Sequence, residues 1–286
     1  KFDELKSLNS QFYETPYGDR ALLKLGLEAM KFYKMGLDND PDILFLGLSA
    51  IDGVGHSFGP NSHEQMDNYL RLDKALGDFI NTIESKIGTN NTLYLLSSDH
   101  GVLDLPEYLQ SKGVNAGRIP RVQRDSLFSY VIDQIDEQIG EGNVNYYGKN
   151  FYFNKNLNPK KRKIASNILK THLIKIAGIE SVLSKEEIIN GDNSKISTRL
   201  KNMIHDTKSP DIFLIPKKYW ISSVSGTTHG SPYDYDAHIP FFVSRSSKRK
   251  TNYFLKVKSV DIAPSLAKIL KISFPQNLDG KPISLK

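Results

Sequence analysis

A chain of 286 residues can bury a sizeable core, and its hydrophobic and charged fractions, 39% and 24%, are ordinary for a globular protein. The absence of cysteine excludes a disulfide, a thiolate metal site and a cysteine nucleophile. The formal net charge of +6 is modest, and we interpret its two short basic runs, 160–163 and 248–250, as solvated loops. No apolar run approaches the ~20 residues that a membrane-spanning helix needs. We therefore expect one large α/β domain, or one domain with an insertion.

The first part of the chain alternates helices with apolar strands. Apolar residues at helical spacing predict a helix from Asp19 to about Leu37, and the continuous apolar run at 42–49 is typical of a buried parallel strand. The pattern repeats with a helix over 63–87 and a strand over 92–96. This order predicts an α/β fold with a mostly parallel sheet flanked by helices.

Two pairs of polar residues follow these strands. Asp52 and His56 come after the first strand, and Asp99 and His100 come after the second. Binding and catalytic sites in open α/β sheets form outside the carboxyl ends of the strands, and both pairs lie at such positions. They are our first candidates for functional residues.

The rest of the chain consists of a middle segment and a return to the α/β pattern. The middle lacks a repeating strand–helix pattern, and we interpret it as an inserted α+β segment or cap. The predicted domains are an α/β core with the two ligand pairs at 1–112, the insertion at 113–210, and the returning core with a third ligand loop at 211–286. In the middle segment we expect a hairpin at 143–154 and a helix at 160–177. In the last domain we expect strands at 211–216 and 239–243 and a final helix at 261–270. The third loop is rich in Gly, Ser, Thr and Tyr and carries His229.

The chemistry of Asp52, His56 and His229 indicates a divalent metal ion, because carboxylate oxygen and imidazole nitrogen both bind zinc. Side chains four positions apart can face one ion, and an Asp/His/His set with an open fourth position is typical of catalytic zinc. Asp99 and His100 are adjacent, so they share an ion only where the backbone turns, which the following glycine permits. Together these residues predict a two-metal hydrolase site that needs at least one more anionic ligand from elsewhere.

Each of these patterns also has an ordinary interpretation when taken alone. An Asp and a His four positions apart recur by chance, the Asp99 and His100 pair could form a capped turn, and His229 could be a simple loop histidine. His238 competes with His229 as a histidine that supports the site. The joint placement of the pairs after strands favours metal binding.

Three segments together resemble a known family. They are Asp52-Gly53-Val54-Gly55-His56, Ser98-Asp99-His100-Gly101-Val102 and His229-Gly230-Ser231-Pro232-Tyr233-Asp234-Tyr235-Asp236. The set resembles the alkaline phosphatase superfamily, and within it the bacterial monomeric alkaline phosphatases related to type I phosphodiesterases and nucleotide pyrophosphatases. The resemblance extends from about Pro16 to Gly280 and is weakest in the middle segment. The chain is similar to the C-terminal part of such an enzyme.

This resemblance implies an alkaline-phosphatase-like fold and a role for each candidate. Asp52, His56 and His229 would hold one zinc ion, and Asp99 with His100 would hold a second. In the family, a further aspartate ligand and a threonine or serine nucleophile lie upstream of the first motif. We therefore expect both groups upstream of Lys1, the first residue of this chain, and no catalytic nucleophile within it.

Four hydroxyl residues beside the ligand motifs are the alternatives for a nucleophile, namely Ser97, Ser98, Thr227 and Thr228. None occupies the position that the family uses. We interpret them as turn residues that bond to the backbone.

The expected function is zinc-dependent hydrolysis of phosphate monoesters by a longer parent protein with two zinc ions, and this chain alone is expected to be inactive. The alternatives are a phosphodiesterase or nucleotide pyrophosphatase, a non-catalytic metal-binding fragment and a nucleic-acid binder. The expected partner is a small-molecule phosphate ester, with neither nucleic acid nor a membrane, and a monomer is the expected state. The resemblance implies a periplasmic or secreted enzyme.

Overall fold

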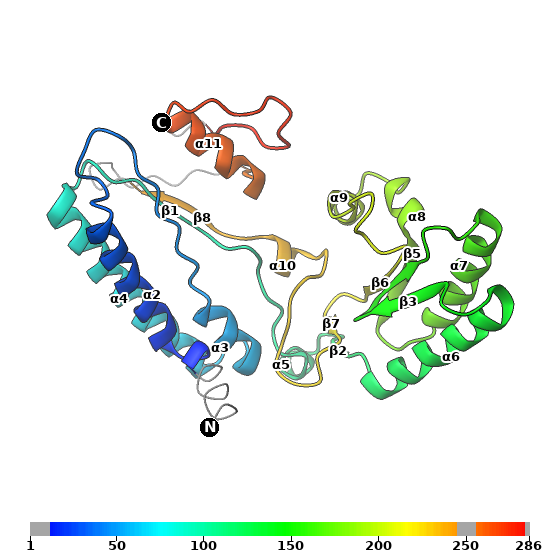
Figure 1. Ribbon diagram of the computed structural model, residues 1–286. Coiled ribbons are helices and arrows are strands. Elements are labelled where there is room, and N and C mark those ends of the chain that lie inside the picture. Colours follow the sequence, from blue (N-terminus) through cyan, green and yellow to red (C-terminus); the bar gives the residue numbers. More distant parts are fainter. Residues whose placement is uncertain (1–11, 245–255, 284–286) are drawn as a thin grey trace, which may run out of the picture. The chain divides into compact units, whose positions relative to one another are not determined.

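The computed structural model describes residues 12–244 and 256–283 (Figure 1). They form two compact units. Unit 1 contains 12–15, Ala50–Tyr69 and Asp99–Ile239, and unit 2 contains Pro16–Ser49, Leu70–Ser98 and the described residues from Pro240 onward. All five candidate ligands belong to unit 1. The predicted domain boundaries at 112 and 210 stay predictions.

A four-stranded antiparallel sheet forms the centre of unit 1. Its strands are β3 (Val144–Tyr147), β4 (Asn150–Phe153), β5 (Ile179–Ser184) and β6 (Ile212–Pro216), in the spatial order β3-β4-β6-β5. Helices α6 (Arg121–Ile139) and α7 (Pro159–Leu173) pack against this sheet and against each other. Residues between 113 and 210 thus supply most of the core of unit 1.

Helix α7 illustrates why this layer forms. At its start, the side chain of Asn158 accepts a backbone hydrogen bond and Pro159 fits the first turn. Ala165, Leu169 and Leu173 follow at intervals of four and are fully buried on one face. They join the other fully buried side chains of this core, Phe128, Val131, Ile135, Phe151 and Ile212.

The remaining elements of unit 1 are shorter, and the candidate site lies among them. Strands β2 (Gly117–Arg118) and β7 (Trp220–Ile221) form a parallel pair. The helices are α3 (Ala50–Phe58), α5 (Pro106–Ser111), α8 (Lys185–Ile189), α9 (Lys195–Asn202) and α10 (Asp234–Ala237). A second, smaller cluster of Ile188, Leu200, Phe213 and Ile215 packs α8 and α9 beside β6.

Unit 2 is built on two long helices that run side by side, α2 (Pro16–Phe32) and the later part of α4 (His63–Ile87) (Figure 1). Its buried core is small and consists of Leu23, Phe79 and Ile83. Strands β1 (Tyr94–Ser97) and β8 (Phe241–Ser244) pair antiparallel, and η1 (Ser259–Asp261) leads into α11 (Ile262–Ile269).

Several large apolar side chains of unit 2 remain exposed. Phe32 and Phe45 are each 79% exposed. On the β1–β8 pair, the cross-strand neighbours Leu96 and Phe242 are 47% and 60% exposed. Neighbouring exposed apolar side chains such as Leu96 and Phe242 are typical of a face that another polypeptide or ligand covers.

Most predicted elements are confirmed. The helix over 63–87 has the predicted ends, and the 143–154 hairpin appears as β3 and β4. The first helix begins at Pro16, so Asp19 lies inside it, and it ends at Phe32 rather than near Leu37. It ends early because Lys34 and Gly36 both adopt the left-handed conformation, with φ of +54° and +74°.

The apolar run at 42–49 is not a strand in the structure, although its side chains alternate as in one. Leu44, Leu46 and Leu48 pack on the helical core of unit 2, whereas Ile43 and Phe45 are exposed. Among the described residues this run has no neighbouring strand, and a strand needs one for its hydrogen-bond ladder. The described strand pairs are mostly antiparallel, not mostly parallel, and the β2–β7 pair alone is parallel among them. The α/β class itself is confirmed.

The basic run at 160–163 is the beginning of α7 and not a loop, because Pro159 starts the helix there. Two of its basic side chains make contacts within unit 1. Arg162 forms an ion pair with Asp211, with Nη1 2.9 Å from Oδ1, and Lys161 donates a hydrogen bond to the carbonyl of Ile139. The second run, 248–250, lies outside the described residues. In the described part of the chain, no helix is both long and apolar enough to cross a membrane.

Candidate metal centre

Helix α3 places the first two candidate ligands on one face. Asp52 and His56 are separated by four positions, which is one helical turn. Their side chains meet, with His56 Nε2 3.4 Å from Asp52 Oδ1. The predicted geometry of this pair is therefore present.

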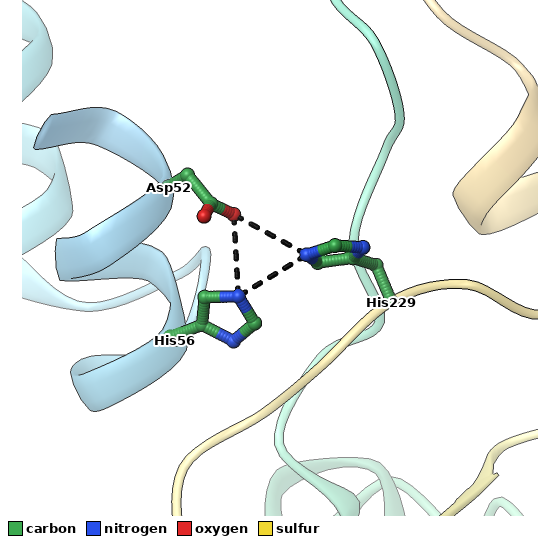
Figure 2. Close-up of side chains that lie close together, drawn as sticks. All are labelled: Asp52, His56 and His229. Carbon is green, nitrogen blue, oxygen red and sulfur yellow. Dashed lines mark hydrogen bonds and ion pairs between the residues drawn. The ribbon is translucent and has the colours of Figure 1, made fainter. Parts of the chain in front are cut away.

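His229 joins this pair from a distant loop (Figure 2). Its Nε2 lies 3.1 Å from His56 Nε2 and 3.6 Å from Asp52 Oδ1. One oxygen and two nitrogen atoms thus lie within 4.8 Å of one another, and all three side chains are between a quarter and two-fifths exposed. This donor set can hold one divalent ion and leave a coordination position open to solvent.

The backbone orients the His56 ring. Its Nδ1 lies 2.8 Å from the carbonyl oxygen of Thr227, which can only accept, so Nδ1 donates and Nε2 keeps its lone pair toward Asp52 and His229. The backbone N–H of Thr227 donates in return to the carbonyl of His56 at 2.9 Å. These two bonds fix the loop against the end of α3.

The loop can approach α3 only because residue 226 is glycine. Gly226 has φ of +57°, and a Cβ there would lie 2.0 Å from the carbonyl oxygen of His56. Arg118 holds the loop from the other side by donating to the carbonyls of Ser223 and Gly226 at 3.0 and 2.8 Å. Glu107 fixes this guanidinium with contacts of 2.6 and 2.9 Å.

Asp99 and His100 lie beside the group of three but are not part of it. The His100 ring stacks on that of His229, with centroids 3.3 Å apart and 13° between planes. Its Nδ1 lies 3.0 Å from the carbonyl oxygen of Gly101, which can only accept, so Nδ1 donates there and Nε2 carries the lone pair. The Asp99 side chain is 86% exposed, and its Oδ2 is 3.5 Å from His100 Nε2. The structure thus brings His100 to the group and leaves the Asp99 carboxylate in solvent.

The surroundings of His229 favour the neutral form of its ring. Burial lowers the pKa of this imidazole, the neighbouring His100 and His56 rings lower it further, and Asp52 partly opposes them. A neutral imidazole is the form that binds metal.

The alternatives from the sequence can be compared with these contacts. His238 is exposed and lies outside the three-residue group of the described chain. Thr227 Oγ1 donates to the carbonyl of Leu103, and Ser97 Oγ to that of Pro240, which confirms that these two hydroxyls bond to the backbone. The sequence did not reveal Arg118, whose contacts depend on chain segments far apart. Gly226 had only the weak signal of a glycine in a polar loop.

The nucleophile and the further aspartate ligand expected upstream of Lys1 are not tested by these contacts. Lys1 lies outside the described residues, which begin at Phe12, so the structure does not bear on what stands before it. Both groups therefore stay predictions from the family resemblance.

Tyr233, four residues after His229, is a buried residue whose phenol group can ionise. It is 8% exposed, and its hydroxyl donates to the carbonyl of Pro216 at 2.8 Å. Burial, with a smaller contribution from Tyr235, raises the pKa of Tyr233 to about 12.

We expect stability to fall between pH 10 and about 12, and Tyr233→Phe to lessen this fall. The folded chain keeps the Tyr233 proton up to about pH 12, whereas an unfolded tyrosine loses it near 10. The contribution is therefore complete below pH 10, is lost as pH rises through the folded pKa, and is on the order of 2 kcal/mol. Urea unfolding across this range measures it. Tyr147→Phe, at a position 82% exposed, is the control, and the same pH slope in both variants would contradict the expectation.

Comparison with known proteins identifies the family. The family model of type I phosphodiesterase / nucleotide pyrophosphatase matches residues 5–238. The chain belongs to this family. The resemblance inferred from the three motifs is therefore confirmed.

The chain is also similar to proteins that are named alkaline phosphatases. Alkaline phosphatase PafA of Elizabethkingia meningoseptica is 31% identical over 94% of this chain and 50% of its own length. Alkaline phosphatase PhoV of Synechococcus elongatus is 30% identical over 96% of this chain and 50% of its own length. The crystal structure of PafA matches with a TM-score of 0.85 over 96% of this chain and 53% of that one. The alkaline-phosphatase-like fold is thereby confirmed, and the chain spans about half the length of the curated relatives it matches.

Proposed function

We propose that this chain forms part of a zinc-dependent enzyme that hydrolyses phosphate monoesters. The observation that carries the proposal is the convergence of Asp52, His56 and His229, with His100 stacked against the last of them. The naming of PafA and PhoV as alkaline phosphatases supports the reaction class.

The donor set fits zinc. It offers one carboxylate oxygen and two imidazole nitrogens, and the hydrogen bond at His56 Nδ1 leaves Nε2 with its lone pair. Zinc supplies Lewis-acid polarisation of a phosphoryl oxygen when it is bound at such a site. Asp52 contributes the negative charge, the two imidazole rings contribute nitrogen donors, and partial exposure keeps one side open to substrate.

Asp99 and His100 are our proposed ligands for the second zinc ion. Asp99 Oδ2 lies 3.5 Å from His100 Nε2, so one carboxylate oxygen and one imidazole nitrogen are close enough to bind the same ion. Two ligands do not close a site, so we place a further aspartate and the threonine or serine nucleophile in polypeptide upstream of Lys1. The half-length match to the relatives and the exposed apolar side chains of unit 2 support that placement.

The proposed substrate is a small-molecule phosphate ester, and by resemblance the enzyme acts in the periplasm or outside the cell as a monomer. The family name favours a second candidate, a phosphodiesterase or nucleotide pyrophosphatase. A third is a non-catalytic metal-binding fragment, which the half-length match favours.

Rates on 4-nitrophenyl phosphate and on its bis-ester, measured with the protein extended to the length of its relatives, test the proposal. We expect the monoester to be hydrolysed at least about 10-fold faster, and this chain alone to turn over little of either while still binding zinc. A faster diester reaction would favour the second candidate. A chain that takes up no zinc, or a phosphatase activity unchanged by His56→Ala, would contradict the proposed centre.

A further inference from the structure

One buried carboxylate connects the two loops that carry the candidate histidines. Asp236, in α10, is 4% exposed, and its Oδ2 accepts a hydrogen bond from the backbone N–H of Ser231 at 2.7 Å. Its own carbonyl oxygen accepts from the N–H of Gly101 at 2.6 Å. Ser231 lies two positions after His229, and Gly101 directly follows His100, so one residue is bonded to both loops.

The second of these contacts depends on the glycine of the Asp-His-Gly motif. A Cβ on Gly101 would lie 2.2 Å from the carbonyl oxygen of Tyr235 and 3.5 Å from the Cα of Asp236. The two backbones can therefore meet only where residue 101 has no side chain. This close approach supports the stacked arrangement of His100 and His229.

The neighbouring acid of the same motif has a different role. Asp234 is exposed, and it pairs with Lys195 and Arg199 of α9, each at 2.7 Å. Those two cations lower the pKa of Asp234 to about 2. Asp234 is bonded to neither metal loop through its side chain, so it is a matched control for Asp236.

Asp236 also lines a cavity whose wall includes His229. Oδ1 has no hydrogen-bond partner among the described residues, and the cavity wall includes Lys149 and Arg124. Burial lowers the pKa of Lys149, and the Asp236 carboxylate partly opposes this effect. A buried carboxylate needs compensating charge, and Lys149 is a cation in the same cavity that interacts with it electrostatically, while the bond to Ser231 stays in place.

We propose that Asp236 is a positioning residue that holds the His229 loop in register with the His100 loop for metal binding. The inference rests on the proposed metal centre. The Asp236 carboxylate holds the His229 loop by accepting from the Ser231 N–H. The backbone carbonyl of Asp236 holds the His100 loop by accepting from the Gly101 N–H. Residues that orient metal ligands typically change metal affinity by 10–100-fold when they are replaced.

The test is Co²⁺ titration of this chain, followed by the visible absorption of the bound ion, with urea unfolding of each metal-free variant. Asp236→Ala removes the acceptor, and we expect at least about 10-fold weaker binding and an altered cobalt spectrum. Asp236→Asn keeps an oxygen that can accept from Ser231, and we expect affinity within about three-fold of the unsubstituted chain. Asp234→Ala should leave both readouts unchanged.

Each result has a definite meaning. Undiminished binding by Asp236→Ala, or equal losses in Asp236→Ala and Asp236→Asn, would overturn the positioning role while leaving the metal centre intact. If the unsubstituted chain takes up no cobalt, the proposed centre fails and this inference fails with it. If Asp236→Ala does not fold, hydrogen exchange of the unsubstituted chain decides: slow exchange at the Ser231 and Gly101 amides supports the role, and exchange as fast as in an unstructured peptide overturns it.

Discussion

Replacing His229 with alanine is expected to lower the affinity of this chain for zinc by about 100-fold or more. The substitution removes one of three donor atoms that lie within 4.8 Å of one another. The remaining pair, Asp52 and His56, cannot close even a three-ligand site. Competition with a chromophoric zinc chelator measures the loss.

The control for this experiment is His238→Ala. His238 lies nine positions later, is exposed and is outside the group of three in the described chain, so its removal should leave zinc affinity within error. Urea unfolding without metal should show similar stability for both variants, because neither side chain is fully buried. Equal zinc affinity in the two variants would mean that the convergence seen in Figure 2 does not bind metal.

The sequence predicted the elements whose signal is local. The helix over 63–87 is periodic along its whole length, and the 143–154 hairpin has aromatic strands around a glycine turn. The contact between Asp52 and His56 is also predictable from local sequence, because a spacing of four residues on a helix brings the two side chains together. His229 is far along the chain from that pair, so its chemistry made it a candidate third ligand and the family resemblance assigned it to the same ion.

The sequence failed where the outcome depends on a partner far along the chain. Residues 42–49 have the composition of a buried strand, but a strand also needs a neighbour, and the described chain offers none there. Asp234 and Asp236 look equivalent in the motif, yet one pairs with α9 in solvent and the other bonds to two loops. Asp99 and His100 are adjacent, and only the structure shows that one side chain is exposed while the other stacks on His229.

Gly226→Ala should be among the most damaging single substitutions in unit 1. The new Cβ would lie 2.0 Å from the carbonyl oxygen of His56, which belongs to the backbone of α3 and cannot move without displacing the helix. The positive φ adds a further cost of about 1 kcal/mol. We therefore expect a loss of about 3 kcal/mol or more in the free energy of unfolding, together with weaker zinc binding as the Thr227 carbonyl leaves His56 Nδ1.

Gly148→Ala separates the two causes. Gly148 has nearly the same backbone angle, φ +61° against +57°, but a Cβ there meets no atom within 4 Å. It should therefore show only the conformational cost, about 1 kcal/mol, with unchanged zinc affinity. Urea unfolding and zinc competition on both variants give the comparison. If the two alanines cost the same, backbone strain alone explains glycine at 226, and the close approach of the His229 loop to α3 does not constrain the centre. If Gly226→Ala costs more and also weakens zinc binding, the contact between these backbones is what orients His56 toward the metal.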